Sequence, residues 1–414
     1  MGHKARRVGA PALVALGAVG VAGVLVTGVA GATAEPGPPA LTRTMVYSIG
    51  VAGGEGKMLQ LDHPVPTQVP GIPGHVVEVA TSNSDSYALT SSGAVWAWGA
   101  GGLGELGNGS TPRLSGTPVR VELPPGVKIS SLPNPMPYNS GLAIDTRGDL
   151  WGWGFNQQGS LCMPGGPLLR PVRLPATGVT LASGAGDHTL FDSRGTVYAC
   201  GLGQAGELGD GSTASSSDPV AVVGLPLGVV SLTSSWQGSG ALLSNGAYYD
   251  WGFNREGQMG NGGTTDVLAP VKVNLPHRVV QVWQGGSTAS NGQTLALLTD
   301  GSVWAWGAGQ LGQLGDGGWQ SASTPVRVSL PAHARISEVC SGGDTSYALT
   351  TSGELWSWGG NLYGQLGQGR GGLPQALPGQ VDVTLAQLSA TATNVVGLAT
   401  PVGSPPPGPT HRPL

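Results

Sequence analysis

Ser91–Gly107 reads SSGAVWAWGAGGLGELG, a polar turn followed by a short apolar strand that ends in Trp-Gly and a glycine-rich loop. The same pattern returns at residues 147–162, 194–209, 245–260, 300–315 and 352–367, and a weaker copy stands at residues 46–59. Short strands that recur in this way indicate a repeat protein.

The glycines that end these strands give the period of the repeat. They are Gly50, Gly99, Gly154, Gly201, Gly252, Gly307 and Gly359, and they lie 49, 55, 47, 51, 55 and 52 residues apart. A period of about 50 residues built from short strands is typical of a propeller or a solenoid.

Each repeat can be divided into four strands. In the first full repeat these are Val76–Val79, Tyr87–Leu89, Val95–Trp98 and the proline-bounded segment Pro118–Pro124. Prolines at both ends suit the outer edge of a sheet, where a missing N–H costs least and strand addition must be discouraged. The corresponding outer segments are expected at Pro171–Pro175, Pro219–Pro226, Pro270–Pro276 and Pro325–Pro331. Four-stranded sheets arranged radially form a propeller.

The two ends of the array predict how the ring closes. The chain enters it at Met45–Gly50 without the two strands that normally come first, and it ends with Val381–Leu388 and Val395–Leu398. The last strands should therefore complete the first blade and remove the free edge. We predict an all-β protein, a seven-bladed β-propeller of four-stranded blades with a composite first and last blade, over residues 44–402.

The segments outside the propeller differ in composition. Residues 1–34 begin with Lys4, Arg6 and Arg7, continue with an uncharged run from Val8 to Ala34, and end in Ala-Thr-Ala. This order is typical of a secretion signal cleaved before Glu35, although a run of 27 residues could also remain as a membrane anchor. A proline-rich linker is expected at residues 35–43, and a disordered proline-rich tail at residues 403–414.

Composition and charge narrow the class of partner. After the signal the chain has 16 Lys or Arg against 23 Asp or Glu. Nucleic acid is therefore an unexpected partner, because phosphate binding needs clustered Lys and Arg side chains.

The three cysteines, Cys162, Cys200 and Cys340, permit one bridge at most, and we expect them to be buried small hydrophobic residues rather than a disulfide framework.

The strand, Trp-Gly and Gly-Gln-Leu-Gly pattern is clearest at residues 306–315 and 358–367. It resembles the regulator of chromosome condensation repeat, and an export signal would make this chain an exported, bacterial-type member of that family. The resemblance implies a seven-bladed propeller with composite closure. It also implies a possible guanine-nucleotide exchange activity, but no basic arm or wedge-like insertion matches those of the eukaryotic founder.

The sequence contains only weak matches to the motifs of cofactor, metal or catalytic sites. The sequences GAGGLG, GLGQAG and GAGQLG, at residues 99–104, 201–206 and 307–312, match a dinucleotide fingerprint. However, they run into the repeat loop instead of opening a helix, so we interpret them as structural. The seven histidines show no metal-ligand spacing, and a GxSxG elbow is absent from the sequence. We therefore predict a protein without metal, cofactor or catalytic site.

Three of the twelve tryptophans, Trp236, Trp283 and Trp319, fall outside the repeat positions. When the repeats are aligned, Trp236 occupies the same position as Tyr138, in the turn between the first two strands of a blade. The fifth full repeat carries extra residues in that turn. Such turns meet around the channel, where an exposed aromatic side chain can anchor a partner. The candidate rim consists of Tyr138, Trp236, Asp85, Asp187, His188, Asp344, Ser287 and Asn291. The alternatives are that the aromatic side chains pack on neighbouring blades and that the acids cap turns.

We expect an exported, monomeric and non-enzymatic scaffold whose axial face binds a protein or a cell-surface ligand. Membrane attachment is expected only if residues 8–34 stay uncleaved. The first alternative is a guanine-nucleotide exchange factor, from the family resemblance. A weaker alternative is a secreted hydrolase or lyase with its site in the central channel, because propeller enzymes assemble sites from several blades.

Overall fold

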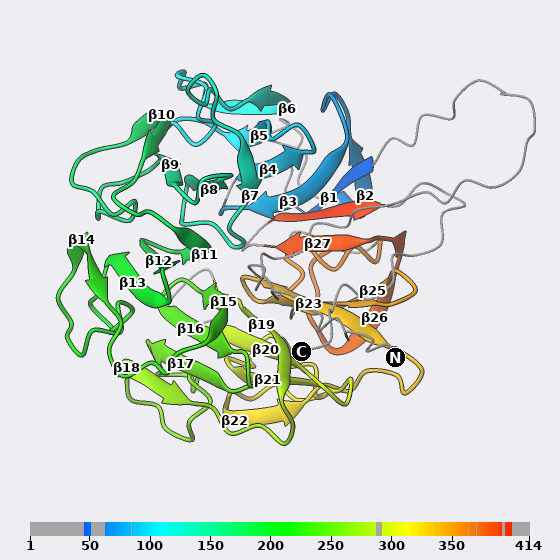
Figure 1. Ribbon diagram of the computed structural model, residues 1–414. Helices are drawn as coiled ribbons and strands as arrows, with labels where there is room; N and C mark the ends of the chain where they lie inside the picture. The colour runs from blue at the N-terminus through cyan, green and yellow to red at the C-terminus, as the bar shows by residue number, and fades with distance from the viewer. Residues whose placement is uncertain are drawn as a thin grey trace, which may run out of the picture.

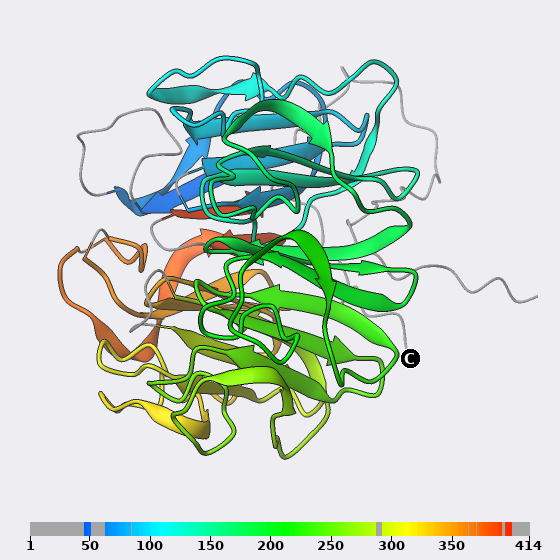
Figure 2. The ribbon, with the colours of Figure 1, turned by 90° about the vertical axis from the view of Figure 1, so that its left-hand side faces the viewer.

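The computed structural model describes residues 45–50, 63–83, 85–286, 292–362, 364–369, 371–390 and 394–399. Within these ranges all 28 strands belong to seven four-stranded antiparallel sheets, and no helix is present. The sheets are arranged around one axis, with β27, β3, β7, β11, β15, β19 and β23 nearest the centre (Figure 1). Figure 2 shows the same ring from the side. The predicted seven-bladed β-propeller is confirmed.

We number the blades 1 to 7 and give the strands of each from the centre outwards. Blade 1 is made of β27 (Gln387–Ala390), β28 (Asn394–Ala399), β1 (Met45–Gly50) and β2 (His63–Val69). Blade 2 is made of β3 (Val76–Thr81), β4 (Asp85–Thr90), β5 (Val95–Ala100) and β6 (Leu114–Arg120). Blade 3 is made of β7 (Ile129–Ser131), β8 (Ser140–Asp145), β9 (Leu150–Gly154) and β10 (Leu168–Arg173). Blade 4 is made of β11 (Val179–Ala185), β12 (His188–Ser193), β13 (Thr196–Gly201) and β14 (Ser216–Ala221).

The remaining blades follow the same order. Blade 5 is made of β15 (Val229–Ser234), β16 (Gly238–Leu243), β17 (Tyr248–Gly252) and β18 (Val267–Lys272). Blade 6 is made of β19 (Val279–Gln284), β20 (Gln293–Leu298), β21 (Val303–Gly307) and β22 (Ala322–Arg327). Blade 7 is made of β23 (Ile336–Gly342), β24 (Thr345–Thr350), β25 (Glu354–Gly359) and β26 (Gln375–Thr384).

The ring closes through pairing of the first and last strands. The blue strand β1 lies beside the red end of the chain (Figure 1), and Val46 on β1 pairs with Leu398 on β28. Composite closure is therefore confirmed, but the expected strand Val381–Leu388 is wrong in its bounds. Val381 belongs to β26, where it pairs with Leu355, and the innermost strand of blade 1 begins only at Gln387. The outer strand of blade 7 is long and includes residues 381–384, which the apolar pattern had assigned to blade 1.

The outer strands begin earlier than their prolines predicted. In blade 2 the strand starts at Leu114, and Pro118 lies inside it. Gly99 pairs with Ser115 and Ala97 with Val119, so the register shifts between these two pairs, across the proline. Pro171, Pro219, Pro270 and Pro325 also lie inside their outer strands. A proline is tolerated there because an irregularity on an edge strand needs no N–H donor.

At three interfaces, neighbouring blades are joined by a hydrogen bond from the tryptophan that precedes the strand-ending glycine. Nε1 of Trp153 in blade 3 donates a hydrogen bond of 2.8 Å to the carbonyl oxygen of Glu105 in the glycine-rich loop of blade 2. Trp251 donates in the same way to Glu207, at 2.9 Å, and Trp358 to Gln313, at 3.0 Å. All three tryptophans are fully buried.

The last glycine of the loop is required by this contact. Gly107 has a φ of +58°, which side chains rarely adopt, and a Cβ there would lie 2.9 Å from Cδ1 of Trp153. Gly209 and Gly315 face Trp251 and Trp358 in the same way. The repeated Gly-Glu/Gln-Leu-Gly sequence is therefore the part of each blade that receives the tryptophan of the next blade.

Blades 3 and 4 are joined by a disulfide bond instead. Cys162 stands at the glycine position of the blade 3 loop, and Cys200 at the tryptophan position of blade 4. Their Cα atoms lie 5.1 Å apart and their sulfur atoms are bonded. The expectation that both are buried free cysteines is wrong, because the loop and strand positions that meet at every such interface carry the two thiols here. Cys340 is free and buried, as expected.

The inner strands are joined by a second contact. Oε2 of Glu78 on β3 accepts the backbone N–H of Leu132 in blade 3 at 3.1 Å. At the same place in blade 6, Oε1 of Gln281 accepts the backbone N–H of Val339 in blade 7 at 2.8 Å. A long acceptor side chain at this position therefore satisfies an otherwise unpaired N–H of the next blade.

We expect replacement of both bonded cysteines by serine to lower the free energy of unfolding by up to about 4 kcal/mol, the loop-entropy value for a cross-link spanning 38 residues. The double variant Cys162→Gly/Cys200→Trp restores the contact of the other blades and should regain part of this loss. Urea unfolding measures both effects. Titration of the denatured, unreduced parent should show one free thiol, and three free thiols would contradict the bond.

Stability should also fall as pH rises. Burial raises the pKa of Glu78 from 4.5 to about 8. Since the unfolded glutamate ionises near pH 4.5, the stability present below that pH is lost progressively up to about pH 8. The loss should amount to about 2 kcal/mol between pH 6 and pH 8. Glu338, whose pKa is also raised to about 8 by burial, keeps some solvent contact and should contribute less. Glu78→Gln copies the native Gln281 and should flatten the pH profile of chemical unfolding; an unchanged slope would refute the assignment.

Candidate axial binding surface

The turns between the first and second strands of the blades meet at one end of the central channel. They line a small cavity to which all seven blades contribute, with Asn83, Pro135, Met136, Tyr138, Ala185, Gly186, Ser234, Ser235, Trp236, Gln284, Gly285, Gly286, Ser341, Gly343 and Ala390. The convergence expected from the aligned repeats is confirmed. The cavity has a volume of about 40 Å³, whereas small-molecule sites have about 300–1,000 Å³. This end of the channel therefore offers a surface rather than a pocket.

The segment from Leu132 to Asn139 covers the channel end. Met136 donates its backbone N–H to the carbonyl of Thr81 in blade 2 at 3.1 Å, and Pro135 accepts the N–H of Gly184 in blade 4 at 3.1 Å. The side chain of Met136 is 2% exposed. Because β7 has only three residues, blade 3 supplies the longest described turn, and this turn crosses to both neighbours.

Tyr138 and Trp236 form an aromatic pair on this surface. Their ring centroids lie 4.9 Å apart and the planes are at 89°, an edge-to-face arrangement. The backbone N–H of Tyr138 also donates to the carbonyl of Gly186 at 2.7 Å, so blade 3 reaches over blade 4 towards blade 5. Both side chains remain partly exposed. The two aromatic residues that sequence alignment placed level with each other are therefore in contact.

Two of the proposed rim residues are buried. His188 and Asp85 are 0% exposed, so neither lies on the surface as predicted. They begin the second strands of their blades, which are buried along almost their whole length. Nε2 of His188 lies 2.9 Å from Oγ of Ser239 in blade 5, and burial lowers the pKa of His188 to about 4. Oδ2 of Asp85 accepts a hydrogen bond of 2.8 Å from the hydroxyl of Ser82.

Asp187 and Asp344 are partly exposed in the turns of blades 4 and 7. Burial of part of each carboxyl raises the pKa of Asp187 and of Asp344 above the usual value. Each backbone carbonyl accepts an N–H from the start of the glycine-rich loop, Asp187 from Leu202 and Asp344 from Gly360. These two are the only carboxyl side chains on the described turns of this surface outside the strands, and those turns hold no Lys, Arg or His.

The extra residues of the blade 6 turn lie in part outside the described residues, and Ser287 and Asn291 are among those left out. At the end of the turn, Nε2 of Gln293 donates to Oγ of Ser341 in blade 7 at 2.6 Å. The described end of this turn therefore joins two blades at the channel.

Sequence reasoning missed Asp250, which is fully buried on β17 where sister strands carry alanine, glycine or serine. Its Oδ1 accepts a hydrogen bond of 2.6 Å from Nε2 of Gln284, which lines the axial cavity from blade 6. Burial raises the pKa of Asp250 well above its usual value. The signal was present in the sequence, because Asp250 interrupts the repeat Trp-Ala-Trp-Gly as Tyr-Asp-Trp-Gly.

The other two irregular tryptophans lie elsewhere. Trp283 is 7% exposed and packs with Cys340, Tyr347 and Val395 in the core between blades. Trp319 is 46% exposed in the loop before the outer strand β22. Only Trp236 of the three belongs to the axial surface.

Among the described residues, no three His, Cys, Asp or Glu side chains are grouped closely enough to hold a metal ion. Nor does this part of the chain contain a helix that is long and apolar enough to cross a bilayer. Residues 8–34, for which an export signal or anchor is expected, lie outside it.

Two family models described as the Regulator of chromosome condensation (RCC1) repeat match this chain. One matches residues 92–132, 245–289 and 300–349, and the other residues 336–365. The Ultraviolet-B receptor UVR8 of Arabidopsis thaliana is 30% identical over 317 residues, which cover 74% of this chain and 70% of that protein. The human E3 ubiquitin-protein ligase HERC2 is 29% identical over 310 residues, 71% of this chain, but the matched region is 6% of that protein.

Solved structures share the fold. Human WBSCR16 superposes with a TM-score of 0.75 at 20% identity, over 87% of this chain and 100% of that chain. Prp20p from Saccharomyces cerevisiae has a TM-score of 0.75 at 20% identity, over 88% of this chain and 93% of that chain. These four relatives are eukaryotic and do not support the expectation of an exported bacterial-type member. The repeat matches and the likeness to UVR8 show that the chain belongs to the Regulator of chromosome condensation (RCC1) repeat family.

Proposed function

We propose that the protein is a non-enzymatic scaffold that binds another protein through the axial surface around Tyr138 and Trp236. The observation that carries this proposal is the partly exposed edge-to-face pair at the point where the turns of all seven blades meet. Tryptophan and tyrosine are enriched among the residues that dominate protein interfaces. Because the axial cavity is too small for a ligand, the partner must lie on the surface.

The surface is held in place before a partner arrives. Backbone hydrogen bonds fix the Leu132–Asn139 segment to blades 2 and 4, and the ring of Trp236 holds that of Tyr138. Binding to an ordered surface costs less conformational entropy than binding to a mobile loop. Asp187 and Asp344 give this end of the ring negative charge when ionised, so we expect the partner to present basic groups around an apolar centre.

Relatives support a protein partner in general terms. Prp20p is described by its binding properties to Gsp1p and histones. Exchange-factor activity on a GTPase, which the family resemblance implies, is the second candidate. Its support here is the shared fold, and no exchange residue can be assigned to this chain at 20% identity.

We also propose that the protein works outside the cytoplasm as a monomer, with its mature chain starting at Glu35. The basic start, the uncharged run and Ala-Thr-Ala support cleavage at this place. The Cys162–Cys200 disulfide is an independent support, because such bonds persist in oxidising compartments.

Replacement of the Trp236 side chain by alanine tests the axial binding surface. Once a partner has been purified, Trp236→Ala should weaken its binding by at least about 2 kcal/mol, roughly 30-fold in Kd. Loss of the edge-to-face pair should lower stability by only about 1 kcal/mol. Calorimetric binding and melting of the same variant measure the two effects.

Two matched variants complete this experiment. Trp319→Ala removes an exposed tryptophan away from the axis and should change neither quantity, whereas Trp283→Ala should cost roughly 3–5 kcal/mol of stability. If Trp236→Ala binds like the parent protein, or unfolds as Trp283→Ala does, the axial surface is not the binding site.

Export is tested by following the chain in its native cell. N-terminal sequencing of the extracytoplasmic protein should give Glu35 as the first residue, and Ala34→Arg should block cleavage because the position before the cut requires a small side chain. Recovery of Met1 in the membrane fraction would establish the anchored form, and recovery in the cytoplasm would exclude export.

A further inference from the structure

The two ends of the propeller carry opposite charge. In each antiparallel blade the first and third connections lie at the axial end, and the second connection and the link to the next blade lie at the other end, which we call the far end. The described connections of the axial end hold eight Asp or Glu and two Lys or Arg, whereas those of the far end hold three Asp or Glu and five Lys or Arg. The two strand residues on either side of each far-end connection add four Lys or Arg and three Asp or Glu, so the sign is the same.

The two charges are far enough apart to act separately. Strands of six residues separate the ends by about 20 Å. The Debye length at physiological salt is about 8 Å, so a body that touches the far end is attracted or repelled mainly by the charges of that end.

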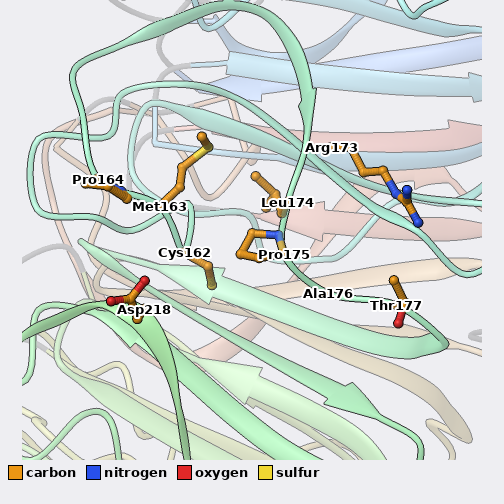
Figure 3. Close-up of a pocket in the computed structure, with 9 residues that line it drawn as sticks. All are labelled: Cys162, Met163, Pro164, Arg173, Leu174, Pro175, Ala176, Thr177 and Asp218. Carbon is orange, nitrogen blue, oxygen red and sulfur yellow. The ribbon is translucent and has the colours of Figure 1, made fainter.

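The cations of the far end are available to a ligand. All five are exposed and have no Asp or Glu within ion-pair distance among the described residues: Lys128, Arg147, Arg194, Arg278 and Arg335. The three acids of the far-end connections, in contrast, have basic neighbours: Glu122 pairs with Arg170 at 2.9 Å, Asp149 pairs with Arg173 at 2.6 Å, and Asp300 lies 3.5 Å from Nε2 of His277. Figure 3 shows Arg173 at the end of β10, beside Pro175, Ala176 and Thr177 of the uncharged link to blade 4. The charge that the far end offers is therefore positive.

Three of these cations occupy equivalent places in different blades. Lys128, Arg278 and Arg335 each precede an inner strand, and their carbonyls accept the backbone N–H of the turn between the second and third strands of the same blade, at 2.8–3.0 Å. Equivalent places in a propeller lie in one plane. Blade 3 also lies across the channel from blades 6 and 7 (Figure 1), so the cations stand on both sides of the channel. A flat surface wider than the ring reaches all of them, whereas a small anion or a narrow polymer reaches only some.

An apolar side chain stands among the cations. Leu227 is 86% exposed in the link between blades 4 and 5, where the sequence Leu-Pro-Leu-Gly takes the place of Leu-Pro-His-Arg at residues 275–278. The link is held in place, because the carbonyl of Gly228 accepts the N–H of Ser244 at 2.8 Å. The carbonyl of Ser244 in turn accepts a hydrogen bond of 3.1 Å from Nη2 of Arg278. An exposed leucine is therefore fixed beside a cation.

We propose that the far end binds the surface of a bilayer that contains anionic phospholipids. Leu227 enters the boundary between headgroups and acyl chains, and the five cations face the phosphates. Each cation near an anionic membrane surface strengthens binding about fivefold, and a basic patch together with one apolar insertion gives stable attachment where either alone is weak. This attachment does not use residues 8–34. It also does not depend on the axial surface, which it leaves facing away from the bilayer.

A fluorescent probe at residue 227 tests the proposal on the full chain. Among the described cysteines two are bonded and Cys340 is buried, so the thiol of Leu227→Cys can be labelled selectively with the environment-sensitive dye NBD. Its emission should shift to the blue with vesicles of equimolar phosphatidylcholine and phosphatidylglycerol, and should stay unchanged with pure phosphatidylcholine or with soluble polyphosphate. Leu373→Cys, labelled in the same way, is the matched control, because Leu373 is 79% exposed in an axial-end loop and should show no shift.

Titration of the residue 227 probe with lipid then tests the cations. Arg194→Gln/Arg278→Gln should weaken binding at least tenfold, because two cations are lost. Arg113→Gln/Arg255→Gln removes two exposed cations of axial-end loops and should leave the affinity unchanged, as should Trp236→Ala. No shift of the residue 227 probe, an equal shift with pure phosphatidylcholine, or full binding by the folded Arg194→Gln/Arg278→Gln variant would overturn the proposal. A blue shift with polyphosphate, or one caused by self-association without lipid, would assign the far end to a different occupant and overturn it too.

Discussion

The packing of a buried tryptophan against the last glycine of the preceding blade's loop recurs at four interfaces of the ring, and at three of them the tryptophan also donates a hydrogen bond to that loop. It explains both halves of the repeat, because Trp-Gly ends the donor strand and Gly-Glu/Gln-Leu-Gly shapes the acceptor loop. A blade alone cannot bury the face that carries this tryptophan, and only the next blade covers it. The same requirement applies at the two ends of the chain, because β28 and β1 must pair to form blade 1 before the last interface can form.

Between blades 3 and 4, a disulfide bond replaces the contact between tryptophan and glycine. A side chain at the glycine position would collide with the tryptophan, so loss of one residue favours loss of the other. The chain carries cysteine at both places and joins them covalently. Cys162 keeps a φ of +54°, in the region its sister glycines adopt, which is unfavourable for a residue with a Cβ. Pro175, which has no N–H, cannot donate the hydrogen bond that Glu122, Val223 and Ser329 make to the last loop glycine of their blades.

The sequence predicted the features that repeat and missed those that occur once. Period, strand number, ring closure and the convergence of Tyr138 with Trp236 all followed from aligned positions. The burial of His188 next to the partly exposed Asp187 did not, because the second strands are buried on both faces and begin earlier than expected. In the first full repeat that strand was expected from Tyr87, whereas it starts at Asp85, the position that His188 occupies in blade 4. The disulfide could in principle have been predicted, since Cys162 and Cys200 occupy the two positions that meet between neighbouring blades. Recognising it required knowing that these positions touch, which only the packing of blades shows.

The architecture also determines how binding surfaces can arise on this chain. Each apolar core is shared by adjacent blades, so a change in one turn or loop is felt mainly by its two neighbours. The axial surface depends on turns of blades 3, 4 and 5, whereas the disulfide joins the loop of blade 3 to the third strand of blade 4. Substitutions at the two places share no side-chain contact among those described, and their effects on stability should add. A ring of similar blades thus acquires local features by departing from the repeat at single positions, as Tyr138 and Trp236 do at the axial surface and Cys162 and Cys200 do between blades 3 and 4.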